Sequence, residues 1–436
     1  MEPFYIALAT ILFLFGYLFL GLWIFVAITA VGLSSMFFLL DFPLDRIGSI
    51  MRAAMWRTAT SYELASVPLF LIMGELIFRT DISDRLFRGL SPWTSFIPGR
   101  LLHCTVAGCT MFAAITGSTT ASTATVGKIT LPELQRRGYD FNIAMGSLAA
   151  AGSLGILIPP SVALIIYGVL TETSIARLFA AGILPGLLIS GLFMLYIAGS
   201  ALLRKGVAPE TAETYTWKDY VGGLWEVTPI VVLMLLVLGS LYAGVATPSE
   251  AAAIGVLAAL VIIVATRQFS LPMLMESLLG AARTSCMVLS IMVAAAFMSS
   301  AISFAHVPQE VSRLIGTLGL GPIGLILLIG LFYIVIGMFL DGMSIMVMTL
   351  PITFPLIMAA GWDPVWFGIF LIIGIELGLL TPPVGFNLFV LQNLTGRSLG
   401  EVAWAAFPFF CLMVVAALIL IVFPQIVLVL PGLMFG

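Results

Sequence analysis

Charged, cysteine and histidine side chains are scarce in this sequence of 436 residues. Only 9% of the residues are Asp, Glu, Lys or Arg, and a net charge of −3 leaves no strongly basic surface for nucleic acid. The four cysteines and two histidines are scattered, with neither CxxC nor HExxH spacing, so no zinc or redox centre of those types is expected. The sequence also lacks a Walker A motif and a long soluble segment, so we expect an ion gradient, rather than nucleotide hydrolysis, as the source of energy.

Hydrophobic residues make up 61% of the chain and gather in long runs. A helix needs about 20 apolar residues to cross the hydrocarbon core of a membrane. Several runs reach this length with few or no ionisable groups, so the sequence predicts an all-α polytopic membrane protein with about ten to twelve crossings. The clearest runs are 4–40, 183–203, 227–243 and 251–266.

Glycine and polar residues divide the chain into segments. Residues 4–40 are too long for one crossing and predict two helices hinged near Gly21. An amphipathic helix at the membrane surface is expected over 41–62, and a further helix over 310–340. The polar stretch 204–219 is the expected boundary between two halves. The predicted regions are 1–100 with N-terminal scaffold helices and interfacial arm helices, 101–203 with transport-domain repeat 1, 204–320 with a polar linker and the second scaffold helices, and 321–436 with transport-domain repeat 2 and a C-terminal helix.

The two halves of the sequence repeat each other at an offset of 223 residues. Glycine, proline and aspartate positions coincide at this one offset without a gap, which indicates an internal duplication. Interrupted helices at corresponding places in two halves are the best sequence indicator of a transporter's binding site. The coincident residues are Pro132 and Pro355, Gly138 and Gly361, Asp140 and Asp363, Gly155 and Gly378, Pro159-Pro160 and Pro382-Pro383, and Pro185 and Pro408.

Each half contains two kinds of interruption. A Pro-Pro pair breaks an apolar span in "GSLGILIPPSVAL" and in "ELGLLTPPVGFNL", and frees backbone carbonyl groups within the membrane. Upstream, "GCTMFAAITGSTTAS" and "GMFLDGMSIMVMTLP" each have an apolar arm, a turn with glycine and a second arm. This pattern predicts a helical hairpin that enters and leaves the membrane on one side. At its tip, carbonyl groups of the first arm can bind a cation and amides of the second arm an anion.

These interruptions supply the candidate site residues. Backbone carbonyl and hydroxyl oxygens suit sodium, which is a small, hard cation. The predicted sodium ligands are Ala113, Thr116, Gly117, Gly155, Ile158 and Pro160 in the first half, and Gly337, Gly342, Gly378, Thr381 and Val384 in the second. The predicted substrate contacts are Ser118, Thr119, Ser122, Asp341, Ser344 and Asn387.

Other interpretations of these residues remain open at this point. The Ser, Thr, Ala and Gly residues of the first tip could serve only to pack helices closely in lipid. Asn387 could contact a polar cavity or form a hydrogen bond between helices. Glu376, a carboxylate within an apolar run, could be functional or could pair with a nearby arginine.

Linked motifs in this sequence resemble a known family. The strings "AGSLGILIPPSVALIIYGVL", "LPELQRRGYD", "ATPSEAAAIG" and "LGLLTPPVGFNLFVLQNLTG" are similar to the large membrane (M) subunit of TRAP transporters, the tripartite ATP-independent periplasmic carriers. The resemblance covers essentially the whole chain. One departure is Thr116-Gly117-Ser118-Thr119, where Ser-Gly-Ser-Ser or Ser-Gly-Ser-Ala is common; the hydroxyl at 116 is kept, so we expect the site to be kept.

The resemblance implies a function and a set of partners. It implies sodium-coupled import of an organic acid, a sialic acid or a C4-dicarboxylate, across the bacterial or archaeal cytoplasmic (inner) membrane, with sodium ions and no organic cofactor. A periplasmic substrate-binding protein (P type) delivers the solute, and a small four-helix membrane subunit (Q type) is expected as a separate chain. The family fold implies two inverted repeats with re-entrant hairpins and Pro-Pro-broken helices, in an elevator-type transporter similar to the ion transporter superfamily.

Two rival functions stay open from the sequence. The chain could be a self-sufficient sodium–carboxylate symporter of related fold. A subunit of a membrane energy-converting enzyme is the other alternative, and the missing His and Cys constellations disfavour it.

Overall fold

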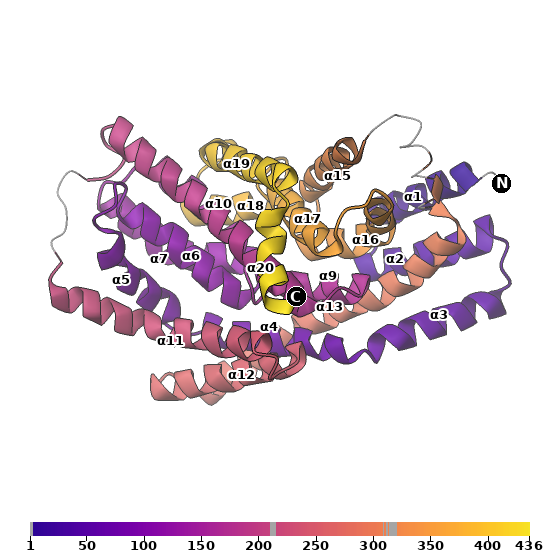
Figure 1. Cartoon of the computed structure of the whole chain (residues 1–436), viewed down its shortest axis with the longest axis horizontal. Helices are drawn as coiled ribbons and strands as arrows, with labels where there is room; N and C mark the ends of the chain where they lie inside the picture. Colours follow the sequence, from indigo (N-terminus) through magenta and orange to yellow (C-terminus); the bar gives the residue numbers. More distant parts are fainter. Residues whose placement is uncertain (1–2, 210–214, 308, 311–312, 314–320) are drawn as a thin grey trace.

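The computed structural model describes residues 3–209, 215–307, 309–310, 313 and 321–436. Every regular element within these residues is a helix, which confirms the predicted all-α class. In Figure 1 the helices α3 (Leu44–Ala59), α11 (Trp217–Tyr242) and α12 (Pro248–Ala265) lie along the lower edge of the molecule, and α15 (Pro322–Gly337) and α19 (Leu399–Val422) lie at the upper edge. The broken helices lie between these two edges.

The N-terminal helices follow the predicted segments. Gly21 has a positive φ of 74° between the first two helices, which confirms the predicted hinge. The segment predicted at 41–62 is helical as α3, and it joins the next helix across a bend of 53°. Its place at a membrane surface stays a prediction. The elements are α1 (Pro3–Phe19), α2 (Ile24–Ser34), a π-helical turn η1 (Ser35–Leu39), α3 (Leu44–Ala59), η2 (Tyr62–Ala65), α4 (Ser66–Phe78) and α5 (Ile82–Thr94).

A hairpin and a broken helix complete the first half. Gly117 separates the hairpin arms in a left-handed conformation with φ 62°, which a residue without a Cβ adopts at little cost. The Pro159-Pro160 pair, joined by a cis peptide bond, lies in the break of the following helix. The elements are α6 (Leu101–Thr116), α7 (Thr119–Arg136), α8 (Phe141–Ser153), η3 (Leu154–Ile156), α9 (Val162–Thr171) and α10 (Ile175–Leu203).

The second half begins with three long helices and then has its own hairpin and broken helix. The helix expected over 310–340 is described from Pro322, and most of the predicted residues before it lie outside the described part of the chain. The elements are α11 (Trp217–Tyr242), α12 (Pro248–Ala265), α13 (Leu271–Phe304), α15 (Pro322–Gly337), α16 (Gly342–Ala359), α17 (Pro364–Leu379), α18 (Phe386–Thr395), α19 (Leu399–Val422) and α20 (Gln425–Phe435).

The helices confirm the internal duplication. The second hairpin arms α7 and α16 begin at residues 119 and 342, and the helices α8 and α17 begin at 141 and 364, so both pairs keep the offset of 223. The helices after each Pro-Pro break keep it to within one residue. Asp140 and Asp363 each accept hydrogen bonds from the second and third amides of the helix that they precede. The duplication therefore includes the helix caps.

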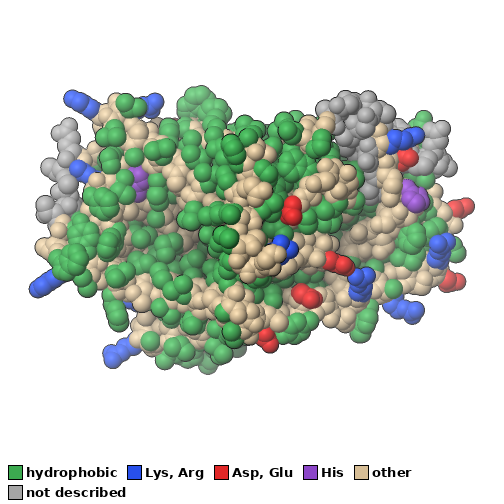
Figure 2. All heavy atoms as spheres, viewed as in Figure 1, with side chains coloured by type: hydrophobic (Ala, Val, Ile, Leu, Met, Phe, Trp, Pro, Cys, Tyr) green, Lys and Arg blue, Asp and Glu red, His purple; other side chains and the backbone are tan. Residues whose placement is uncertain are grey.

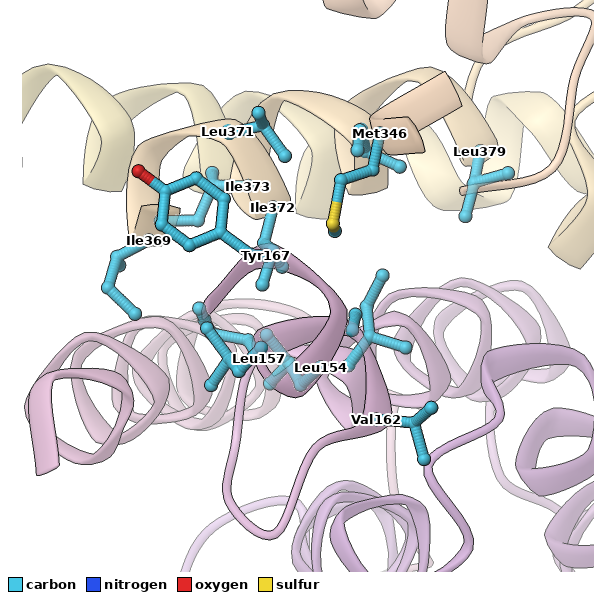
Figure 3. Close-up of a cluster of buried hydrophobic side chains, with 14 of the residues drawn as sticks. Leu154, Leu157, Val162, Tyr167, Met346, Ile369, Leu371, Ile372, Ile373 and Leu379 are labelled. Atoms are coloured by element: carbon cyan, nitrogen blue, oxygen red, sulfur yellow. The ribbon is translucent and has the colours of Figure 1, made fainter. Parts of the chain in front are cut away.

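The broken helices of the two halves pack together in the core. Figure 3 shows Leu154 and Leu157 of the first half on the side facing Met346 and the α17 residues Ile369, Leu371, Ile372 and Ile373. All of these side chains are buried. The Tyr167 hydroxyl of α9 donates a hydrogen bond of 2.5 Å to the Pro364 carbonyl at the start of α17.

Fewer single helices are long enough to cross a membrane than the sequence predicted. Within the described residues six helices qualify by length and composition, or seven if the bent pair α3–α4 counts as one span. The predicted ten to twelve crossings included the broken segments, whose pieces are apolar helices of 10–17 residues. Figure 2 shows hydrophobic side chains over most of the visible face, as expected for a surface in contact with lipid.

Candidate functional site

The tip of the first hairpin is a chain reversal of two residues, Gly117 and Ser118, stabilised by backbone and hydroxyl groups. The Gly117 amide donates to the Ala113 carbonyl over 2.9 Å and ends α6. Ser118 then adopts an extended conformation, and its hydroxyl accepts from the Ala121 amide at the start of α7. The tip thus brings the carbonyl end of one helix next to the amide end of another, as the sequence predicted.

Hydroxyl groups connect the two arms of this tip. The Thr116 and Ser122 hydroxyls are 2.7 Å apart, and Ser122 also donates to the Ser118 carbonyl over 2.7 Å. Thr119 and Ser122 are both buried, and Ser118 is half-buried. The predicted contacts of this tip therefore lie together, and part of their hydrogen-bonding capacity is used within the tip itself.

The first hairpin packs closely on the first helix break. A Cβ built on Gly155 would lie 2.5 Å from the Ala113 Cβ and 2.9 Å from the Ala113 carbonyl oxygen, so only glycine permits this contact. Gly117 approaches Val162 at the start of α9. Two predicted sodium ligands, Ala113 and Gly155, are thus in direct contact although 42 residues separate them in the sequence.

The second hairpin repeats this contact. A Cβ on Gly378 would lie 2.5 Å from the Gly337 Cα, and a Cβ on Gly337 would lie 2.8 Å from the Gly378 Cα. The Met338 carbonyl accepts hydrogen bonds from the Val384 amide at 3.2 Å and the Gly385 amide at 3.3 Å. The break that follows Pro382-Pro383 is therefore bonded directly to the tip of the hairpin.

Both tips reach the same short turn of the chain. Ala113 of the first tip contacts Gly155 in η3, and a Cβ on Gly342 of the second tip would lie 3.6 Å from the Ile156 side chain, the next residue of η3. The predicted residues from the two halves therefore converge on one region, around the break of the first half. This convergence is the strongest geometric indication of a single functional site.

The second tip carries a charge where the first has a hydroxyl group. Asp341 precedes α16 and accepts a hydrogen bond from the Ser344 amide at 3.1 Å, just as Ser118 does for α7. Asp341 is half-buried and Ser344 is almost fully buried. These two predicted substrate contacts lie together at the amide end of a helix, where partial positive charge gathers.

The remaining predicted sodium ligands lie at the breaks. The Thr381 hydroxyl donates to the Leu377 carbonyl over 2.7 Å, and its amide donates to the Gly378 carbonyl over 3.0 Å. Ile158 is half-buried and its side chain packs on Gly186 of α10, while Pro160 is buried in the break. Their carbonyl groups stay predicted ligands.

The donor set suits an alkali cation. Within the described residues no three His, Cys, Asp or Glu side chains gather in a group that could hold a metal ion. The candidate ligands at the two tips are instead carbonyl and hydroxyl oxygens next to helix ends, where the last carbonyl groups lack intrahelical partners. Oxygen ligands of this kind fit sodium.

The structure bears on the alternatives left open for Asn387 and Glu376: Asn387 forms a hydrogen bond between helices, and Glu376 has no arginine partner among the described residues. The Asn387 amide nitrogen donates to the Ala149 carbonyl of α8 at 3.4 Å, so this fully buried side chain bonds to another helix. Glu376 is 1% exposed, and neither of its oxygens has a hydrogen-bond partner among the described residues. The alternative that Glu376 pairs with a nearby arginine is therefore wrong.

Some residues of the site were missed by the sequence reasoning. Ser161 donates a hydrogen bond of 2.5 Å to the Ile156 carbonyl and accepts one from the Leu164 amide, and so holds the first break in shape. Gly74 of α4 brings a helix from outside the hairpin against the Thr116 carbonyl. The sequence could have predicted the Ser161 cap, because a serine directly after Pro-Pro and before an apolar run is typical of a helix start. The contacts of Gly74 and Met338 could not be predicted, because they depend on tertiary packing.

Comparisons with known proteins agree with this geometry. The family described as "Tripartite ATP-independent periplasmic transporter, DctM component" matches residues 11–426. The chain is 34% identical to the C4-dicarboxylate TRAP transporter large permease protein DctM of Pseudomonas aeruginosa, over 92% of this chain and 94% of that protein. It is 30% identical to the isethionate TRAP transporter permease protein DctMQ of Oleidesulfovibrio alaskensis, over 88% of this chain and 60% of that longer protein. The YdaH transporter of Alcanivorax borkumensis has a similar fold, with a TM-score of 0.63 at 14% identity over 89% of this chain and 88% of that chain.

Proposed function

Because the chain belongs to the tripartite ATP-independent periplasmic transporter family, as its large DctM component, we propose that it uses a sodium gradient to import an organic acid. Membership of this family makes the chain a secondary transporter permease rather than an enzyme. Sodium coupling, the class of solute, the partner subunits and the movement of the hairpins are the parts that we propose. The cytoplasmic (inner) membrane of a bacterium or archaeon is the proposed location.

The duplicated contact between each hairpin and its helix break supports sodium coupling. In both halves a glycine of the break touches the end of the first hairpin arm, at Ala113 and Gly155 and again at Gly337 and Gly378. Each contact brings the carbonyl groups at the end of the first hairpin arm next to the backbone of the helix break in the same half. We infer one sodium ion at each contact, held by main-chain oxygens and, in the second half, by the Thr381 hydroxyl.

The tips also favour an anionic solute. The amide ends of α7 and α16 favour a carboxylate, and Ser118, Thr119, Ser122 and Ser344 offer hydrogen-bonding groups there. Asp341 would repel a carboxylate unless a cation lay between the two charges. Binding of sodium before the solute follows from this arrangement, and it would couple the two fluxes.

We propose a C4-dicarboxylate as the solute, in agreement with the name of the Pseudomonas aeruginosa relative. A sialic acid, the other predicted solute, is the alternative for the same site. The family also implies a periplasmic substrate-binding protein and a small four-helix membrane subunit as partners. We propose that the two hairpins and broken helices move together as an elevator against the long helices.

Transport in liposomes tests this function. The chain is reconstituted with its small membrane subunit, and its binding protein supplies radiolabelled succinate or sialic acid. Uptake should need both an inward sodium gradient and the binding protein. Equal uptake with choline in place of sodium would refute sodium coupling, and full uptake by the chain alone would favour the self-sufficient symporter.

A matched pair of substitutions tests the second sodium site. Thr381→Val removes a hydroxyl at the break, and should raise the sodium concentration for half-maximal uptake about tenfold, as expected for one lost ligand. Thr395→Val is the control, because Thr395 makes the same 2.7 Å bond to the carbonyl four residues earlier, at the far end of α18. An unchanged sodium titration for Thr381→Val would remove this hydroxyl from the site.

A further inference from the structure

Glu376 is a buried carboxylate without a bonding partner. It lies in the last turn of α17, is 1% exposed, and both of its oxygens lack a hydrogen-bond donor among the described residues. An ionised carboxyl group in such a place is costly unless a cation or several donors compensate its charge. The carbonyl end of the helix adds further negative potential at this position. A cation bound beside the carboxylate would remove this cost.

The residue that faces Glu376 is its own counterpart in the first half. Ser153 lies next to the Glu376 carboxylate, and 153 and 376 differ by the repeat offset of 223. The Ser153 hydroxyl donates its proton to the Ala150 carbonyl over 2.7 Å. The Ser153 oxygen keeps lone pairs that a cation shared with Glu376 would bind.

A third oxygen without a partner lies on the same face of α8. Asn387 is 0% exposed and donates to the carbonyl of Ala149, one helical turn before Ser153. Its side-chain oxygen has no hydrogen-bond partner among the described residues. Asn387 is therefore anchored within about one helical turn of Ser153, the residue beside Glu376.

This place is separate from the sodium site inferred at Gly378. Successive helix residues point about 100° apart, so positions 376 and 378 face roughly opposite sides of α17. Gly378 faces the hairpin at Gly337, whereas Glu376 faces α8 of the first half. We propose that Glu376, Ser153 and Asn387 bind an additional sodium ion where the equivalent helices of the two halves meet. The site goes beyond the proposed function, because ion binding here can be measured without transport.

Equilibrium binding of radioactive sodium to the full-length chain, purified in detergent, tests this site. Glu376→Gln keeps the shape of the side chain and removes its charge, so it should lower the number of bound sodium ions by one per chain. It should also reduce the rise in melting temperature that sodium gives over choline. Sodium binding and thermal stabilisation equal to those of the wild type would overturn the proposal.

Two serines of α8 provide a matched comparison, which also applies if Glu376→Gln does not fold. Ser147 and Ser153 are both fully buried, and both donate to the carbonyl three residues earlier. Ser153→Ala should weaken binding of one sodium ion about tenfold, whereas Ser147→Ala should leave it unchanged. An equal effect of the two substitutions would indicate loss of packing alone and would overturn the site.

The binding experiment separates this inference from the proposed function. If the wild-type chain binds sodium and Glu376→Gln binds as many ions, the additional site fails while sodium-coupled transport stands. If transport proves independent of sodium while the wild-type chain still binds an ion that Glu376→Gln loses, the proposed coupling fails while the site stands.

Discussion

Single residues at the hairpin tips combine a structural and a chemical role. Ser118 and Asp341 occupy equivalent positions, and each accepts a hydrogen bond from an amide in the first turn of the following helix. Either side chain can cap a helix, but only Asp341 adds a negative charge. The charge is therefore not needed for the fold of the tip, which suggests that it serves ion or solute binding.

Asp341→Asn separates the two roles of this residue. Asn caps a helix about as well as Asp, so the melting temperature should stay within a few degrees of the wild-type value. We expect sodium-driven uptake to fall at least tenfold, because the charge that attracts the cation is lost. Asp363→Asn is the control: Asp363 caps α17 through two amides and belongs to no predicted ligand set, so uptake should be unchanged. Normal uptake by Asp341→Asn would exclude its charge from the site.

A second residue-scale prediction concerns pH. Hydrogen bonds from Arg136, and the bonds and charge of Arg137, hold the pKa of Glu133 below its ordinary value of 4.5, against a smaller opposing effect of burial. Glu133 forms ion pairs with Arg136 at 2.7 Å and with Arg137 at 2.6 Å. These pairs stabilise the fold fully above pH 4.5, and the stabilisation is lost as the pH falls through the lowered pKa of Glu133. Glu133→Gln should cost about 0.5 kcal/mol at pH 7. In thermal melts this difference should shrink as the pH falls below 4.5 and vanish once the pH is below the lowered pKa. A constant difference across this range would contradict the account.

Sequence reasoning was most successful for residues whose role is local. Pro-Pro pairs, the glycine of the first tip and the aspartate caps mark their own backbone conformations, so their places in the fold could be predicted. The bonds from the Met338 carbonyl to the Val384 and Gly385 amides could not, because two segments 46 residues apart must first pack together. The contact between Glu376 and Ser153 depends on packing between the halves in the same way.

At the scale of elements, the close approach of helix ends defines the site. Gly155 lets the broken helix touch the end of α6, and Gly378 does the same for α15. A side chain at either position would separate the two backbones whose carbonyl groups are proposed to share an ion. We therefore expect substitutions at these two glycines to disturb the site strongly.

Gly155→Ala tests the first of these contacts. Its Cβ would lie 2.5 Å from the Ala113 Cβ, so the hairpin must move or the helix must bend. We expect a loss of about 1–3 kcal/mol of stability and a weaker response of uptake to sodium. Gly191→Ala in α10 is the control, since nothing lies within 4 Å of its added methyl group; it should be neutral or stabilising by up to about 1 kcal/mol. Equal melting temperatures and sodium titrations for the two variants would contradict the close contact.

The equivalent elements of the two halves are not identical. In the first half α3 and α4 are separate helices that meet at a bend of 53°, whereas the corresponding stretch of the second half is the single 34-residue helix α13. Neither stretch has a proline at the position of the bend, and Thr60 and Ser61 carry the bend in the first half. The sequence predicted helices in both places but not this difference, because threonine and serine only weakly disfavour a helix and neighbouring helices decide the path.

At the scale of the whole molecule, the two halves share one core rather than forming separate units. Broken helices from the two halves face each other in Figure 3, and the Tyr167 hydroxyl links α9 to the Pro364 carbonyl of α17. Tyr167 is fully buried, and its apolar surroundings strengthen this hydrogen bond. We therefore expect the halves to unfold together.

Tyr167→Phe tests this connection. The substitution removes one buried hydrogen bond between the halves, so the single thermal transition should stay cooperative and move down by the equivalent of about 1 kcal/mol. Tyr196→Phe is the control, because Tyr196 also reaches the second half but does so through its ring, which packs on Phe409. Two separate transitions in Tyr167→Phe, or an equal shift in both variants, would contradict a shared core.

The inherited duplication leaves the two halves with unequal electrostatics. Where the first half has Ser118 and Ser153, the second has Asp341 and Glu376, so both carboxylates at these paired positions lie on one side of the repeat. Of these, Asp341 is the one at a hairpin tip, so the sodium site proposed at the second tip has a carboxylate beside it where the first tip has only a hydroxyl group. We expect the proposed second-half site to fill at a lower sodium concentration than the first, because the carboxylate attracts the cation. The two ions would then bind in a fixed order.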